Sequence, residues 1–454
     1  MATDTSKTEQ SFSMPYEGGL PQASVQKPFA AEEKEICFAL LSFIIGWLYI
    51  QGTIHENIEV RPYFIMALAL TLTVFAEIMY VEKKRTFESV MLLLCFLCCS
   101  FSLSLHQILG RIHIFPYPYT YEGIWEEGQV FFFVHIFFVW YVMSRSGKLL
   151  EGETGHLLPA DAINGFAAIP IMNIFLRIRI LIFGIKSISS KKDEQEKKSF
   201  PWISVAAVLA SAVVLIMAVS LLMQADETFD RIFSRMKDIF DIRFDEIFWF
   251  KLFLSIPVGG WLFSLVSGAF RYEDEKKDKS RQGILSFLET IKKVTPSLWT
   301  TVIAVFSVFY IIFFVIQGNY LFGAFLGKIP AGYIVSHYAR KGFFELCKVT
   351  ALNFFLLWMA TRTANEDIKG SKGFKISTVV FLAESMLFAV IAISKLALYI
   401  SSYGITPLRL QSSWFAAVLF TACALWMYSI LTGKKVFKYW MYFGAISLAI
   451  MCIF

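Results

Sequence analysis

Two apolar segments decide the fold class: FFELCKVTALNFFLLWMAT at residues 343–361 and ISTVVFLAESMLFAVIAISKLALYI at residues 376–400. Each has close to the roughly 20 apolar residues that a helix needs to cross the hydrocarbon core of a bilayer. Ionisable side chains nevertheless occur within both segments: Glu345, Lys348, Glu384 and Lys395. Because a charge in lipid costs at least about 2–3 kcal/mol, we expect these groups to be paired or functional.

The composition extends this interpretation to the whole chain. Of the 454 residues, 56% are hydrophobic, only 17% are charged, and 47 are Phe. Soluble domains carry about 25% charged residues on average. The net charge of +6 is spread over short connections and forms no continuous patch, which argues against a nucleic-acid partner. We therefore predict an all-α, polytopic integral membrane protein whose main partner is the lipid bilayer.

Hydropathy predicts eleven membrane-spanning helices. The fourth is the shortest, and the seventh could extend as far as Leu326. The predicted spans are 37–54, 62–81, 87–108, 129–144, 201–223, 247–270, 298–320, 343–361, 376–400, 412–432 and 437–454.

The positions of Lys and Arg test this assignment independently, because cytoplasmic connections of membrane proteins hold the excess of these residues. The alternate connections that include the N-terminal tail hold most of the 42 Lys and Arg residues. This parity predicts a cytoplasmic N-terminus and an external C-terminus. The polar residues 1–36 are predicted to be a disordered cytoplasmic tail, and residues 37–454 a single multi-span membrane domain.

Two connections are predicted to form surface helices. Residues 166–185 are apolar enough for a twelfth span, but Arg177 and Arg179 lie in their middle and a further span would break the parity. We expect a cytoplasmic interfacial or re-entrant helix whose arginines face the headgroups. In residues 226–241, apolar side chains recur at helical spacing. This pattern predicts an external amphipathic helix that packs on the bundle, lies on the outer membrane surface or covers a cavity.

Motifs for catalysis or cofactor binding are missing from the sequence. It holds no phosphate-binding loop, no dinucleotide-binding glycine pattern, no HExxH and no GxSxG. Cys95, Cys98 and Cys99 have the spacing of metal ligands but lie in an apolar segment without His or carboxylate neighbours. We therefore expect neither a metal nor a cofactor, and any transport would have to draw on an ion gradient or a partner ATPase.

An enzymatic alternative rests on acidic residues in the external connections. Residues 106–128 are rich in Tyr and hold Glu122, Glu126 and Glu127. Membrane glycosyltransferases that act on lipid-linked sugars often place acidic catalytic residues in such a loop. The spacing forms no motif, however, and aromatic residues gather at membrane interfaces in any case.

The charged segments place candidate groups at two depths in the membrane. At about 1.5 Å per residue, Glu345 and Lys395 lie roughly 5–7 Å below the outer ends of their helices, where they could pair. Glu384 lies roughly 24 Å from the outer end, and Asn353 is its nearest polar counterpart by depth. The alternative to a polar binding site is an ion pair that fixes helix packing while the other groups snorkel. The candidate binding residues are Glu384, Glu345, Lys348, Lys395, Asn353 and Arg409.

Two short stretches flank the charged segments: YARKGFFEL at 338–346 and YGITPLRL at 403–410. Together they resemble the paired signatures of a bacterial family of polytopic membrane proteins, the domain-of-unknown-function family 4153/4173. Lys341 and Ile405 stand where the family more commonly has Arg and Leu. The resemblance implies a bacterial inner membrane and supplies no activity. The residues that match the signatures include Tyr338, Arg340, Glu345, Tyr403, Gly404 and Arg409.

These observations favour a transport-like or ligand-sensing protein of the inner (plasma) membrane. Its polar site is expected between residues 343–361 and 376–400, with an ion or a small molecule as the candidate ligand. Two alternatives stay open. One is an integral membrane enzyme that acts on a lipid-linked substrate at the external face. The other is a regulatory or structural subunit that binds another membrane protein, with residues 166–185 as a docking element.

Overall fold

The computed structural model describes residues 29–57, 60–112, 124–190, 246–327, 334–365 and 371–453. Within these ranges every regular element is a helix, apart from one isolated β-bridge between Val294 and Ala364. The elements are α1 (Glu33–Ile54), α2 (Arg61–Met79), α3 (Phe87–Ile112), α4 (Glu127–Arg145), α5 (Leu158–Ile163), the π-helix η1 (Asn164–Ala168), α6 (Ile169–Met172), α7 (Leu176–Ser190), α10 (Glu246–Arg271), α11 (Asp274–Thr290), α12 (Pro296–Ile316), α13 (Gly318–Phe322), the 3-10 helix η2 (Gly323–Leu326), α14 (Val335–Thr363), α15 (Lys372–Tyr403), α16 (Pro407–Thr432) and α17 (Phe437–Ile453). The predicted all-α fold is confirmed.

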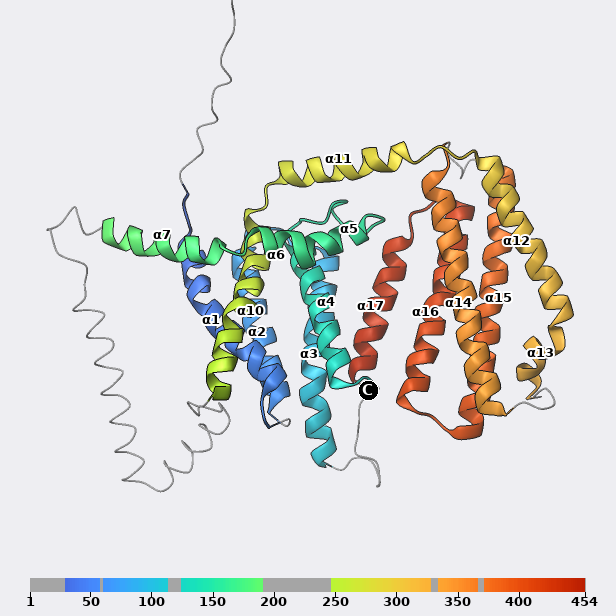
Figure 1. The fold of residues 1–454 in the computed structure, drawn as a ribbon, viewed down its shortest axis with the longest axis horizontal. Helices are drawn as coiled ribbons and strands as arrows, with labels where there is room; N and C mark the ends of the chain where they lie inside the picture. Colours follow the sequence, from blue (N-terminus) through green and yellow to red (C-terminus); the bar gives the residue numbers. More distant parts are fainter. Residues whose placement is uncertain are drawn as a thin grey trace, which may run out of the picture.

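Each predicted span that falls on described residues corresponds to one of these helices. Nine helices in the described part of the chain are long and apolar enough to cross a membrane, and α17 is a shorter apolar helix. In chain order they alternate in direction, except that α4 and α10 both run toward the end of the molecule along which α11 lies. The basic connections gather at that end (Figure 1). The chain is therefore a multi-pass membrane protein. The predicted span 201–223 and the predicted surface helix 226–241 lie outside the described residues.

Proline and glycine set several helix ends. Pro296 and Pro407 occupy the first positions of α12 and α16, where a missing N–H and a fixed φ are tolerated. Gly404 ends α15 at a φ of 78° and Gly433 ends α16 at 73°. A residue with a Cβ is strained at such positive φ values, so glycine is favoured at these two stops.

The segment predicted as an interfacial or re-entrant helix is a bent pair. The stretches 158–172 and 176–187 meet at an angle of 43°, and α7 runs across the ends of α1 and α10 (Figure 1). Arg179 is exposed and its guanidinium lies 4.7 Å from the Phe29 ring centroid. The headgroup-facing orientation expected of both arginines is wrong for Arg177, which is only 6% exposed. It donates to the Ser42 hydroxyl at 3.4 Å and to the Ile256 carbonyl at 3.0 Å, because these oxygens offer the acceptors that a buried guanidinium needs.

Side chains are sorted as expected for helices in lipid. Small hydroxyl residues are buried between helices, where they bond to backbone carbonyls of their own helix, as Ser100 does to Phe96 at 2.8 Å. Large apolar residues face outward on the same helices, among them Leu40, Phe43, Ile44, Leu94, Phe253, Val305, Phe309, Ile312 and Val315. Association between such helices depends on close backbone packing and polar contacts, since lipid is as apolar as the side chains it replaces.

The helices form two bundles with separate hydrophobic clusters. The first contains α1, α2, α3, α4, α10 and α17, and the second contains α12, α14, α15 and α16. α11 spans the distance between them along one end (Figure 1). At its start, the Lys148 ammonium lies 2.6 Å from the Asp274 carboxylate. After its end, Val294 pairs with the end of α14 through hydrogen bonds of 2.9 Å with the Thr363 carbonyl and the Asn365 N–H.

α1 and α10 cross with their backbones close together. A Cβ added to Gly46 would lie 2.1 Å from the Ser255 carbonyl oxygen, and one added to Gly259 would lie 2.1 Å from the Ser42 carbonyl oxygen. Both helices thus present a small residue, three intervening residues and a glycine, the spacing that lets two backbones approach within a membrane.

Gly46→Ala should therefore destabilise the first bundle. The new methyl group collides with backbone that cannot move without separating α1 from α10, so we expect a loss of about 1–3 kcal/mol, read as a lower thermal unfolding midpoint in detergent. Gly444→Ala is the matched control, because a Cβ there meets nothing within 4 Å in the middle of α17. The control should be neutral or stabilising by up to about 1 kcal/mol. Equal midpoints for the two variants would contradict the tight crossing.

Candidate functional site

α15 carries both ionisable candidate groups that are buried in the second bundle. Glu384 is 7% exposed and Lys395 is 0% exposed. Their spacing of eleven residues returns to nearly the same helix face after three turns, with Phe388 between them. At about 1.5 Å per residue they are separated by roughly 16 Å along the helix axis. Both side chains are thus enclosed by the helices of the second bundle.

Lys395 lies in an aromatic setting near the outer end predicted for α15. Its Nζ is 4.0 Å from the Tyr320 ring centroid and 4.3 Å from the Tyr338 ring centroid. The Tyr338 hydroxyl donates to the Tyr320 carbonyl, which holds the two rings together. Among the described residues, no hydrogen-bond acceptor reaches the ammonium. Two aromatic faces offset part of the desolvation of a cation, but an ion pair is missing.

Gly342 of α14 makes the space that Lys395 occupies. A Cβ at this position would lie 2.6 Å from Lys395 Nζ and 2.8 Å from Cδ. The absence of a side chain therefore allows the lysine to lie flat across α14 and turn its ammonium toward the tyrosines. This gives a physical role to the glycine in the stretch YARKGFFEL.

A cavity of about 170 Å³ opens beside this ammonium. Glu345 and Lys395 both line it, so the structure brings these two predicted residues to one site. They form no ion pair with each other in the described part of the chain: Glu345 is exposed and its carboxylate lies 3.9 Å from the Lys341 ammonium. The remaining lining residues are Phe309, Tyr310, Phe313, Tyr320, Leu321, Gly342, Leu346, Val349 and Phe388.

Glu384 lies three turns before Lys395 on α15 and faces α12. Neither carboxyl oxygen has a hydrogen-bond partner among the described residues. The predicted counterpart, Asn353, is close but occupied: it accepts from the Tyr310 hydroxyl at 2.7 Å and donates to the Ser385 hydroxyl at 2.9 Å. This buried chain links α12, α14 and α15. The Ser307 hydroxyl of α12 is the polar group that acts on the Glu384 carboxyl, from beyond hydrogen-bond distance.

The other predicted site residues lie outside this cavity. Lys348 and Arg340 are exposed on α14. Arg409 donates to the carbonyls of Tyr403 and Gly404, and its guanidinium lies 4.1 Å from the Tyr399 ring centroid. Since the last carbonyls of a helix have no partner within the helix, Arg409 completes the end of α15. Tyr403, Gly404 and Arg409 of the signature thus stabilise the C-terminal end of α15.

Comparison with known proteins identifies the family to which most of the chain belongs. The family described as Domain of unknown function (DUF4153) matches residues 124–454, which include both charged helices and their flanking signatures. The chain belongs to this family. No curated protein and no solved structure matches it. The predicted family is thereby confirmed.

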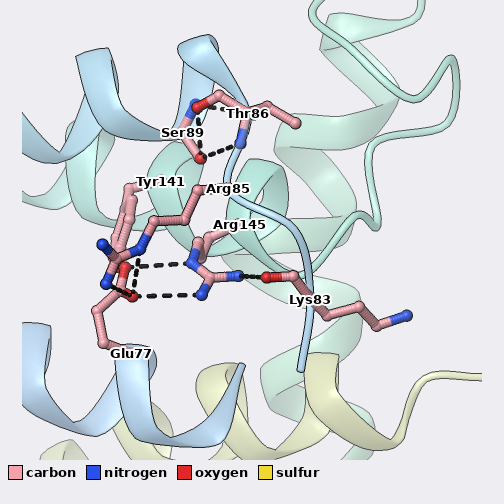
Figure 2. A network of polar contacts seen from close by, with 7 residues as sticks. All are labelled: Glu77, Lys83, Arg85, Thr86, Ser89, Tyr141 and Arg145. Atoms are coloured by element: carbon pink, nitrogen blue, oxygen red, sulfur yellow. Dashed lines mark hydrogen bonds and ion pairs between the residues drawn. The ribbon is translucent and has the colours of Figure 1, made fainter. Parts of the chain in front are cut away.

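In a second cluster of this DUF4153 protein, around Glu77, the charged side chains are fully paired and serve the packing of the helices. The Glu77 carboxylate accepts from the Tyr141 hydroxyl at 2.6 Å, from Arg145 at 3.1 and 3.2 Å and from Arg85 at 2.8 Å (Figure 2). Arg145 also donates to the Lys83 carbonyl at 2.8 Å (Figure 2). Every charge here has partners of opposite sign, so the cluster joins α2 to α4 and needs no ligand.

Sequence reasoning missed this cluster, along with other buried carboxylates that are fully bonded. Glu35 forms two hydrogen bonds of 2.6 Å with Arg271, and Glu88 accepts from Thr154 and Tyr442. It also missed Tyr310 and Tyr320 of the site. Tyr320 ends the predicted span 298–320, a place that is ordinary for an interfacial aromatic residue, and Tyr310 lies in the middle of that span without a distinguishing pattern.

The site of this DUF4153 protein therefore combines a cavity with a buried cation that has no hydrogen-bond acceptor among the described residues and on which Glu345 acts from beyond ion-pair distance. Such an arrangement can bind an anion, because the low dielectric strengthens the attraction and the ammonium is already stripped of water. Within the described residues, no group of three His, Cys, Asp or Glu side chains is placed to hold a metal ion.

Lys395→Met should stabilise the protein. The thioether fills a similar volume, and removing a buried charge that has no ion-pair partner relieves several kcal/mol of desolvation, against about 2 kcal/mol or less for each aromatic contact that is lost. The expected result is a higher thermal unfolding midpoint in detergent without added ligand. Lys372→Met, at the exposed start of the same helix, should shift stability by no more than about 0.5 kcal/mol. A lower midpoint for Lys395→Met would show that the lysine serves packing alone.

Proposed function

We propose that this protein is a transport-like or ligand-sensing protein of a bacterial inner (plasma) membrane, whose ligand is a small anion bound between α14 and α15. One observation carries the proposal: the Lys395 ammonium is fully buried at the wall of a cavity and has no acceptor among the described residues. Proteins tolerate strained or unpaired groups of this kind mainly where function requires them.

The size and the lining of the cavity restrict the ligand. A volume of about 170 Å³ suits a small carboxylate or an inorganic anion rather than a nucleotide or a lipid-linked sugar. Tyr320 and Tyr338 would hold the ammonium while the ligand neutralises it. Glu345, exposed at the same cavity, supplies a negative charge that disfavours dianions.

Glu384 extends the site toward the middle of the membrane. It shares a helix face with Lys395, and Phe388 separates the two, with its ring 5.1 Å from that of Tyr310 and 4.7 Å from that of Phe314. A second unpaired ionisable group on this face supports coupling of the anion to a proton or another ion, as transport driven by an ion gradient requires.

The orientation in the membrane belongs to the same proposal. The basic connections lie at the end that carries α11, and Lys and Arg are enriched on the cytoplasmic side of membrane proteins. With the N-terminus inside and the C-terminus outside, the cavity at Lys395 opens toward the external side. The enzymatic alternative finds less support, because Glu126 caps α4: its side chain accepts from the N–H three residues on, and its own N–H donates to Gln129.

The first test is a thermal-shift screen of the purified protein with chloride, phosphate, acetate and succinate. At least one anion should raise the unfolding midpoint in a saturable way, because a ligand that binds only the folded state stabilises it by mass action. The same anion should produce no shift in Lys395→Met and an unchanged shift in Lys372→Met. An anion-induced shift that persists in Lys395→Met would refute the proposed site.

A pair of carboxylate variants separates this function from the enzymatic one. Glu384→Gln should remove the anion-dependent shift in the unfolding midpoint, because an amide cannot take up or release a proton when the anion binds. Glu127→Gln, in the first turn of α4, should retain the shift. The opposite result, with sensitivity at Glu127 and none at Glu384, would favour an enzyme that works on a lipid-linked substrate. Purification with a stoichiometric membrane protein would instead favour a regulatory subunit.

A further inference from the structure

A larger cavity lies at the opposite end of the second bundle from Lys395. Its volume is about 500 Å³, and it is enclosed by the end of α14, the end of α16 and the start of α17. These ends lie on the side of the molecule along which α11 runs (Figure 1). The aromatic side chains of the wall are Phe354, Phe355, Trp358, Trp426, Phe437 and Trp440. The proposed anion site uses none of them.

Polarity changes along the cavity in the same sense on two of its helices. On α14, Phe354 and Trp358 lie toward the middle of the span and Arg362 lies at its end. On α16, Trp426 precedes Ser429, which is nearer the helix end. At about 1.5 Å per residue, Phe354 is roughly 12 Å deeper than Arg362. The cavity therefore has an apolar interior and a polar mouth, about the length of half an acyl chain.

The mouth is cationic. Arg362 donates to the His156 carbonyl at 3.3 Å, and Lys435 is exposed in the turn between α16 and α17. In the described part of the chain, no carboxylate lies within ion-pair distance of Arg362 or Lys435. The Glu153 carboxylate forms its ion pair with Lys438, at 2.9 Å. The Glu151 carboxylate acts on Arg362 from farther away and accepts from the Leu157 N–H. Two cations facing one distant carboxylate leave a net positive charge.

The cavity can be entered from the side. Phe355 is 57% exposed and Trp358 is 47% exposed, although both line it. In a membrane these two side chains face hydrocarbon. A molecule with one apolar chain could therefore slide in from the bilayer without leaving it, whereas a soluble anion would gain nothing from the aromatic wall.

We propose that this cavity binds one anionic phospholipid. The phosphate lies between Arg362 and Lys435, and one acyl chain lies against Trp358, Trp426 and Trp440. Basic pockets between transmembrane helices recognise lipid headgroups through such charges, and each Lys or Arg near the surface strengthens the binding of an anionic lipid severalfold. The basic connections at this end match the leaflet in which Lys and Arg are enriched.

Native mass spectrometry of the full chain tests the proposal. The protein in mild detergent is titrated with phosphatidylglycerol and, separately, with phosphatidylcholine of the same acyl chains. The first bound phosphatidylglycerol should hold at least about tenfold more tightly than phosphatidylcholine. The double variant Arg362→Gln and Lys435→Gln should reduce the preference to within about twofold. The control pair Arg340→Gln and Lys341→Gln, exposed at the other end of α14, should keep it.

Two further measurements separate the lipid from other sources of the same phosphate. Ala422→Phe fills the apolar part of the cavity, so it should weaken phosphatidylglycerol binding while leaving both cations in place. Inorganic phosphate at millimolar concentration should fail to displace the bound lipid. The proposal is overturned by equal binding of the two lipids, by a preference that survives the double variant, or by displacement with phosphate. If Ala422→Phe does not fold, the double variant decides alone.

Discussion

A charge inside a bilayer needs a partner, and most of this structure follows from how each charge meets that need. Glu77, Glu35 and Arg177 are satisfied by arginines, tyrosines, serines or backbone carbonyls of neighbouring helices. These contacts join helices that apolar packing alone would not hold in lipid. Lys395 and Glu384 differ, because the described residues around them leave both without hydrogen-bond partners. The contrast within one chain separates the charges that build the bundle from those available to a ligand.

The sequence predicted the fold class and the helices well, since twenty apolar residues between polar connections have few other solutions in lipid. It also predicted that Glu384 and Lys395 would be buried, because both lie within the mostly apolar segment 376–400. The sequence could not predict which charged side chains would form ion pairs with each other. Whether Glu345 reaches Lys395 or Lys341 depends on side-chain direction around α14, and hydropathy contains no information on that angle.

The paired carboxylates Glu77 and Glu88 were missed because hydropathy does not show which side chains from distant parts of the sequence meet. Glu77 and Glu88 lie at the ends of predicted spans, where a carboxylate is ordinarily solvated. Their partners Arg145, Thr154 and Tyr442 are distant in sequence and meet them only after the first bundle has assembled. The family match begins at residue 124, yet α1, α2 and α3 share one hydrophobic cluster with α4, α10 and α17. The matched part of the chain thus relies on helices that precede it.

The position of α11 has a mechanical consequence. One end is fixed to the first bundle through Lys148 and Asp274, and the other is continuous with the strand-like pairing of Val294 at the end of α14. A sliding or tilting of one bundle against the other would have to break one of these anchors or carry α14 with it. α11 therefore links the first bundle to one end of α14, the helix whose other end lines the Lys395 cavity.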